Sequence, residues 1–295
     1  MDPNKAYKTY ILHKATYSLP LVYDSPHSGQ DYPKDFDYSC CEFELKKSED
    51  CFVNEFFEDA ALYDACYLGA LFPRSYIDVN RSLIDDIDTE LHEHNANKNP
   101  SHSPSPRARA GIGLIRRLLK ADTPIYNKKL CFKEVEHRIE NYYIPYHNAL
   151  QSLIDSLHHN HGQVWHVNCH SMPSGKIQWY NNGYMPRLMP DFVIGDRDGT
   201  SCSREFTNLI RNFLDNKGYK VKINDPYKGV EIVKRHGLPH LNRHSVQLEI
   251  NKALYMDESG YTKSRNFNKL KSDINDLKNH ISQFVRNQQI PAAAD

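Results

Sequence analysis

The chain has no excess charge of either sign, because 37 lysine and arginine residues balance 37 aspartate and glutamate residues and the pI is about 7.3. It therefore lacks the basic field typical of nucleic-acid-binding proteins and the acidic tail of proteins with strongly charged partners. No stretch reaches the roughly 18–20 apolar residues of a membrane span, and no apolar core of a secretory signal is found near the start. We expect a soluble cytoplasmic protein that binds neither nucleic acid nor membrane.

Several cysteine, glycine and serine motifs are also absent. The seven cysteines are scattered without a Cys-x-x-Cys pair, which argues against a cysteine-only zinc site and favours reduced thiols. Gly111-x-Gly113 lacks the third glycine of a dinucleotide-binding loop, and no Gly-x-Ser-x-Gly elbow exists. Cys169 and His170 are adjacent, so on a strand their side chains point to opposite faces, and a Cys–His nucleophile is not expected.

What is present is an alternation of strand-like and helix-like segments. Strands are predicted at 19–24, 76–79, 164–168, 191–197, 219–223 and 244–250, and helices from Ser48 as N-cap, over 127–160 with a break at Pro145, near 201–216 and over 262–286. This alternation predicts one α/β domain over residues 1–295, with a mixed, mostly parallel sheet covered on both faces. Residues 83–110 are polar and contain three prolines, which indicates an inserted loop or lid.

Two histidines stand where apolar strands give way to turn-forming residues. His27 follows the strand at 19–24, and His170 follows the strand that starts at Val164. Ligands of α/β folds bind just past the carboxyl ends of strands, so the two imidazoles are predicted to share one metal ion. A carboxylate is the expected third ligand, with Asp50 preferred and Asp31 as its rival. The alternative for either histidine is a turn residue bonded to a neighbouring carbonyl.

The strand at 244–250 carries Glu249 on the same face as Gln247 and Asn251. This face is either exposed or part of a site, because an unpaired carboxylate is costly to bury in a sheet covered on both sides. Beside a metal ion, Glu249 could act as a general base.

Asn80 and Arg81 follow a predicted strand, and an arginine in this position can hold a carboxylate through two hydrogen bonds. The alternative is a surface arginine paired with Asp85 or Asp86. Similar cations near glycine-containing turns are Arg116, Arg117 and Arg235.

Five sequence blocks occur in an order that resembles the N-formylglutamate amidohydrolase (N-formylglutamate deformylase) family. They are DSPHSG at 24–29, IDVNRS at 77–82, NCHSMPS at 168–174, GDRDGTSC at 195–202 and QLEINKALYMDE at 247–258. The resemblance covers roughly residues 18–260, and its specificity comes from the ordered set of blocks.

The resemblance implies a three-layer α/β/α sandwich of the phosphorylase/hydrolase-like type, related to the zinc carboxypeptidases and aspartoacylase. It also implies hydrolysis of N-formyl-L-glutamate to formate and L-glutamate, a late step of histidine degradation, with a small carboxylate as substrate. We expect one zinc ion per chain, with another divalent metal as the alternative. In this comparison His27 and His170 are metal ligands, Asp50 is the third ligand and Glu249 is the general base. Asn80 and Arg81 bind the substrate carboxylate.

The chain departs from the family pattern at Asn168, where the family usually has an aspartate, and at Lys228-Gly229, where a double glycine is common. An outer partner orients a ligand histidine, so Asn168 could weaken metal binding. We expect Arg117 or Arg235 to hold a second carboxylate or to stabilise the oxyanion. The alternatives are an aspartoacylase- or carboxypeptidase-like hydrolase of another N-acyl amino acid or peptide, and a non-catalytic, metal-free binding protein.

Overall fold

A computed structural model describes residues 8–84, 104–119, 123–175 and 188–289. Its centre is a seven-stranded sheet with the strand order β1-β3-β2-β4-β7-β5-β6. The strands are β1 (Tyr10–His13), β2 (Leu21–Ser25), β3 (Cys66–Ala70), β4 (Val164–Met172), β5 (Phe192–Gly195), β6 (Val221–Ile223) and β7 (Arg243–Asn251). A small separate hairpin consists of β8 (Met256–Asp257) and β9 (Thr262–Lys263).

The sheet is mixed and mostly parallel, as the sequence predicts. β1 pairs antiparallel with β3, and β5 pairs antiparallel with β7. The other four pairings, including that of the two longest strands β4 and β7, are parallel.

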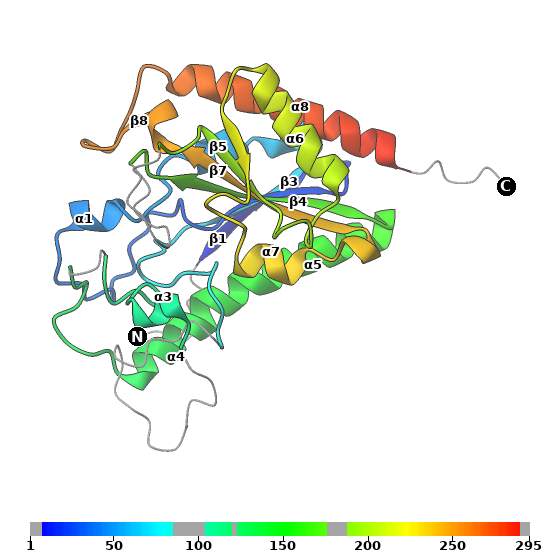
Figure 1. Cartoon of the computed structure of the whole chain (residues 1–295). Helices are drawn as coiled ribbons and strands as arrows, with labels where there is room; N and C mark the ends of the chain where they lie inside the picture. The colour runs from blue at the N-terminus through cyan, green and yellow to red at the C-terminus, as the bar shows by residue number, and fades with distance from the viewer. Residues whose placement is uncertain (1–7, 85–103, 120–122, 176–187, 290–295) are drawn as a thin grey trace.

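Helices cover both faces of the sheet (Figure 1). One face packs against α2 (Asn54–Phe57), α6 (Arg204–Asn216) and α8 (Phe267–Gln288), and the other against α4 (Phe132–Arg138), α5 (Ile144–His161) and α7 (Glu231–His236). Each layer of helices shares a buried apolar cluster with the sheet. The predicted three-layer α/β/α sandwich is therefore confirmed.

Helical periodicity explains the outer layers. On α8 the residues Leu270, Ile274, Leu277 and Ile281 recur every three or four positions and are all buried. The helix predicted over 127–160 runs without a gap from Phe132 to His161, and the irregularity expected at Pro145 takes the form of a π-helical turn at Ile139–Tyr143 directly before it.

Two sequence predictions are wrong. No continuous helix starts at Ser48: its hydroxyl donates to the carbonyl of Leu45, and Phe52 has a left-handed φ of 65°, so regular helix begins only with α2. Residues 76–79 form a buried turn instead of a strand, with hydrogen bonds from Tyr76 N to Pro73 O and from Arg81 N to Asp78 O. Apolar residues of this turn cover the core without joining the sheet.

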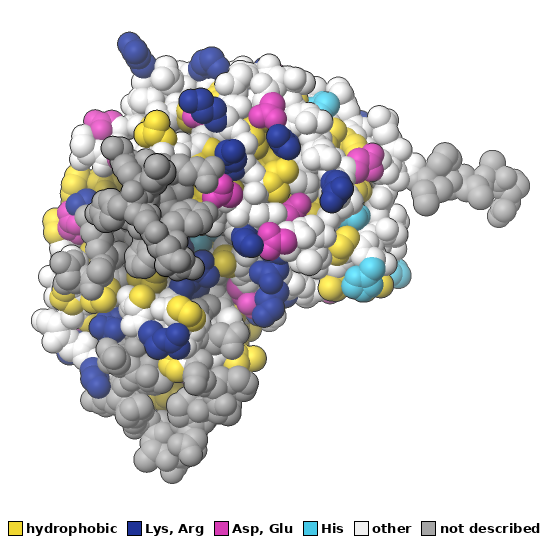
Figure 2. Space-filling model, viewed as in Figure 1, with side chains coloured by type: hydrophobic (Ala, Val, Ile, Leu, Met, Phe, Trp, Pro, Cys, Tyr) yellow, Lys and Arg dark blue, Asp and Glu magenta, His cyan; other side chains and the backbone are white. Residues whose placement is uncertain are grey.

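Much of the predicted polar insertion at 83–110 lies outside the described residues. Its described end contains α3 (Pro106–Arg109), which follows Ser105 as N-cap. The remaining short elements are α1 (Glu42–Lys46) and the 3-10 turns Ala60–Tyr63, Pro239–Leu241 and Lys252–Leu254. No helix in the described parts of the chain is both long and apolar enough to cross a bilayer. On the face seen in Figure 2, basic and acidic side chains are interspersed, in keeping with the balanced composition.

Candidate active site

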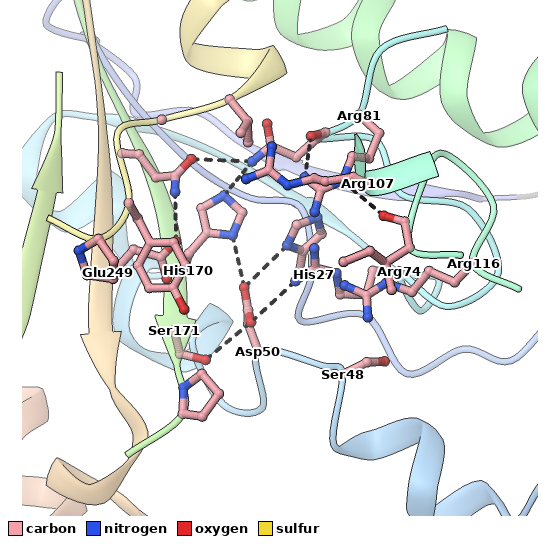
Figure 3. Close-up of a pocket in the computed structure, with 18 of the residues that line it drawn as sticks. His27, Ser48, Asp50, Arg74, Arg81, Arg107, Arg116, His170, Ser171 and Glu249 are labelled. Atoms are coloured by element: carbon pink, nitrogen blue, oxygen red, sulfur yellow. Dashed lines mark hydrogen bonds and ion pairs between the residues drawn. The ribbon is translucent and has the colours of Figure 1, made fainter. Parts of the chain in front are cut away.

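The two predicted histidines and Asp50 meet at one point (Figure 3). His27 follows the end of β2, whereas His170 lies inside β4, which is longer than predicted. Asp50 is held beside the His27 loop, because its backbone N–H donates to the carbonyl of His27 and its carbonyl accepts from the hydroxyl of Ser28. The two imidazole rings lie 4.6 Å apart, and one potential ligand atom from each of the three residues falls within 4.8 Å of the others.

The orientation of His27 is set by Asp78. The Nε2 atom of His27 lies 2.7 Å from Oδ1 of Asp78, and a carboxylate can only accept, so Nε2 carries the hydrogen. The other ring nitrogen, Nδ1, therefore carries no hydrogen and has a free lone pair. This atom is buried without a hydrogen-bond partner in the described chain and lies 3.4 Å from Oδ2 of Asp50.

The orientation of His170 is set by Asn168 and, behind it, Asp24. The amide nitrogen of Asn168 donates to Oδ1 of Asp24 at 2.7 Å, which turns the amide oxygen towards His170. That oxygen lies 2.7 Å from Nε2 of His170 and accepts its hydrogen, which leaves Nδ1 directed at Oδ2 of Asp50 at 2.9 Å. An asparagine can thus supply the acceptor that the family usually takes from an aspartate.

This arrangement fits a divalent cation. Two imidazole lone pairs face one carboxylate, and such groups repel unless a proton or cation lies between them. Burial lowers the pKa of His170. Burial opposes ionisation of Asp50, but its contacts with His170 and His27 hold its pKa well below the usual range. Neutral imidazole and ionised carboxylate are the forms that bind a metal. The rival Asp31 is exposed and lies outside this cluster.

The cluster lines a cavity of about 820 Å³. Four arginines, Arg74, Arg81, Arg107 and Arg116, lie on one side of it and Glu249 lies on the opposite side (Figure 3). Arg74 pairs with Asp78 at 2.6 Å and approaches Asp50 at 4.0 Å. Arg81 donates to the carbonyl of Asn80 at 3.0 Å. Arg74 and Arg107 are not among the residues predicted from the sequence; for Arg74 the only signal is its i,i+4 spacing to Asp78, and for Arg107 there is none.

Two predicted cations lie elsewhere, which corrects the sequence interpretation. Arg117 lines a separate hollow with Leu118, Pro124 and Tyr126. Arg235 forms an ion pair with Glu231 at 2.8 Å and does not line the cavity. Neither position gives a basis for the predicted role in stabilising the oxyanion or binding a second carboxylate.

Glu249 lies on β7 beside His170 in the parallel register with β4. Its side chain is 6% exposed, so the alternative of an exposed sheet face is wrong. One carboxylate oxygen accepts a hydrogen bond from the amide of Gln247 at 2.7 Å. Burial and the nearby charge of Asp50 raise the pKa of Glu249 to about 8. Asn251, the third polar residue of this strand, caps the following 3-10 turn instead of lining the cavity.

The side chain of Asn80 is already engaged within the protein. Its Oδ1 accepts from the backbone N–H of Ile232 at 3.0 Å, and its amide nitrogen donates towards the side-chain oxygens of Asn168 and Gln247, both at 3.5 Å. Asn80 therefore contacts Asn168, the residue that orients His170, while Arg81 is the member of the pair better placed to meet a ligand.

Comparison with known proteins identifies the family of the chain. Residues 19–256 match the N-formylglutamate amidohydrolase family. An N-formylglutamate deformylase of Pseudomonas putida is 26% identical over 251 residues, which are 82% of this chain and 83% of that protein. The crystal structure of an N-formylglutamate amidohydrolase from Ralstonia eutropha has a TM-score of 0.88 and 39% identity, covering 95% of this chain and 99% of that chain. A protein from Agrobacterium tumefaciens shares the fold at a TM-score of 0.58 and 18% identity, over 95% and 97% of the two chains. The chain belongs to the N-formylglutamate amidohydrolase family.

Proposed function

We propose that this protein is a zinc-dependent amidohydrolase that cleaves N-formyl-L-glutamate to formate and L-glutamate. The observation that carries the proposal is the buried cluster of His27, Asp50 and His170 beside Glu249 in an arginine-lined cavity. Family membership supports the reaction class.

One zinc ion per chain would be held by Nδ1 of His27, Nδ1 of His170 and the carboxylate of Asp50. Three protein ligands leave a coordination position open, as catalytic zinc sites require. When bound, the ion supplies Lewis acidity, which polarises an amide carbonyl and makes a water molecule more acidic.

Glu249 is the proton carrier of the reaction. It faces the cavity next to His170, and the hydrogen bond from Gln247 fixes one of its oxygens. The carboxylate accepts a proton from the attacking water and then delivers it to the leaving amine nitrogen, so that L-glutamate departs with a neutralised nitrogen.

Arg81 binds one carboxylate of the substrate. Its guanidinium donates to the backbone carbonyl of Asn80, which holds it at the cavity wall. A substrate carboxylate therefore approaches a charged donor group that is already oriented. Asn80 lines the same wall and contacts Asn168, which orients His170.

A substrate panel tests the proposal. Protein purified without chelator is expected to contain about one zinc per chain, and formate release is expected from N-formyl-L-glutamate in preference to N-acetyl amino acids and peptides. Preferred cleavage of an acetylated or peptide substrate would indicate an aspartoacylase- or carboxypeptidase-like hydrolase. A metal-free protein that hydrolyses none of them after zinc is added would contradict the proposal.

A further inference from the structure

Arg116 lines the cavity without a counter-ion among the described residues. It makes no hydrogen bond or ion pair with any residue that the structure describes, and its Nε is shielded from solvent without an acceptor. Arg74, on the same wall, pairs with the carboxylate of Asp78. Arg116 is half-buried, and its Nε–H is withdrawn from water without an acceptor, which is unfavourable; an anion bound at this cavity wall would supply the missing partner.

The backbone holds Arg116 in this position. The neighbouring Leu114 and Ile115 are buried, and the carbonyl of Leu114 accepts a hydrogen bond from Asp78 N at 2.7 Å. On the other side, Arg117 N donates to the carbonyl of Gly111 at 2.9 Å. The segment that carries Arg116 is therefore hydrogen-bonded to Asp78, which orients His27, and to Gly111 at the beginning of the same loop. Arg116 points into the cavity, while Arg117 lines the separate hollow.

The charges around Arg116 leave room for an anion. Burial and the neighbouring cations Arg74 and Arg81 lower the pKa of Arg116 to about 9, and the carboxylates of Asp78 and Asp50 offset this only in part. Because Asp78 already pairs with Arg74, a substrate carboxylate at this wall would compensate the charge of Arg116. Arginine suits this task because its fork of donors matches the two oxygens of a carboxylate.

We propose that Arg116 is the specificity-determining residue that binds the side-chain carboxylate of the substrate, while Arg81 binds the α-carboxylate. This inference rests on the proposed function and extends it. It makes the cavity selective for acidic N-formyl amino acids over neutral ones of the same size.

The test compares N-formyl-L-glutamate with N-formyl-L-glutamine, which has nearly the same shape without the side-chain charge. In Arg116→Gln, kcat/KM for N-formylglutamate is expected to fall on the order of 10²-fold, while kcat/KM for N-formylglutamine changes less than about threefold. Arg116→Lys should recover part of the loss because it restores the charge without the fork. Arg117→Gln is the matched control, because it removes the same charge one residue away and outside the cavity.

Equal losses for both substrates in Arg116→Gln would overturn the proposal, as would a selective loss in Arg117→Gln. If the zinc-loaded wild type hydrolyses neither substrate, the proposed function fails while Arg116 can still be tested by calorimetry with glutarate and butyrate. Tighter binding of glutarate than of butyrate, lost in Arg116→Gln and kept in Arg117→Gln, supports the anion site. The absence of that preference in the wild type, or its survival in Arg116→Gln, rejects it. Thermal unfolding of each variant checks that it is folded.

Discussion

The two faces of the central sheet differ in chemistry although the same strands build them. On β4, Val167 and Cys169 point into an apolar cluster under α6 and α8. His166, Asn168 and His170 point to the other face, which α5 and α7 cover. Because successive side chains of a strand point to opposite faces, a polar residue on one face leaves the apolar packing of the other face unchanged.

The polar face forms a continuous buried ladder that ends at the candidate site. The parallel register sets His166 beside Ser245, Asn168 beside Gln247 and His170 beside Glu249. All six side chains are at most 6% exposed. Buried polar groups are tolerated only when they bond one another, so this ladder contributes orientation, whereas the apolar clusters on the two faces contribute most of the stability.

The largest expected effect concerns the apolar face. Ile274 is fully buried on α8, so Ile274→Ala should reduce the free energy of unfolding by about 2–5 kcal/mol. Chemical denaturation measures this change. If the faces divide their tasks as proposed, zinc affinity and kcat of the folded variant remain close to wild type. A loss of zinc affinity comparable to that of a ligand substitution would contradict the division.

Glu249→Gln tests the polar face at the reacting atoms. The substitution preserves the size of the side chain and still allows its contact with Gln247, but it removes the group that carries the proton. We therefore expect kcat to fall by a factor on the order of 10² or more. Zinc content, measured by elemental analysis, should stay at about one per chain. Normal turnover in this variant would show that another group moves the proton.

The sequence was most informative where periodicity is strong. β4, β7, α6 and α8 have alternating or helical apolar patterns, and their positions were predicted within a few residues. Failures occur where the backbone leaves regular geometry. The left-handed conformation of Phe52 ends a helical pattern that composition alone would continue, and the turn at 76–79 is as apolar as a strand.

The same dependence on regular patterns holds for the site residues. His27, Asp50 and His170 can be predicted because strand ends and the family blocks mark them, and the structure brings them together. Which arginines line the cavity cannot be predicted in this way. Whether Arg116 or Arg117 faces the cavity depends on the path of an irregular loop, for which no period exists, so the prediction favoured the wrong one of two neighbouring cations.

A smaller effect is expected at Asn168, one step behind the metal cluster. Asn168→Leu removes the acceptor for His170 and the link to Asp24, so zinc affinity in a chelator competition should fall about 10- to 100-fold. Cys169→Ala is the matched control, because Cys169 is the adjacent residue on the apolar face. It should lower stability while leaving zinc affinity unchanged. Equal affinity losses in both variants would mean that the strand itself is disturbed.

The smallest expected effect is the pH dependence of stability at the base of the ladder, where Asp24 is fully buried. Burial opposes its ionisation, but His166, Asn168 and Tyr146 bond to its carboxylate and lower its pKa below the ordinary value. A depressed folded-state pKa means that the ionised form stabilises the protein above the unfolded-state pKa of about 3.9, and that this contribution disappears as the pH falls through the folded-state value.

Zinc-free wild type should therefore exceed Asp24→Asn in unfolding free energy by about 1–2 kcal/mol at pH 6, and the gap should close towards pH 3. Asp215→Asn, on the exposed side of α6, should show little difference across this range. A gap for Asp24→Asn that is independent of pH would mean that the ladder is held by packing alone and that its charge contributes nothing to the orientation of His170.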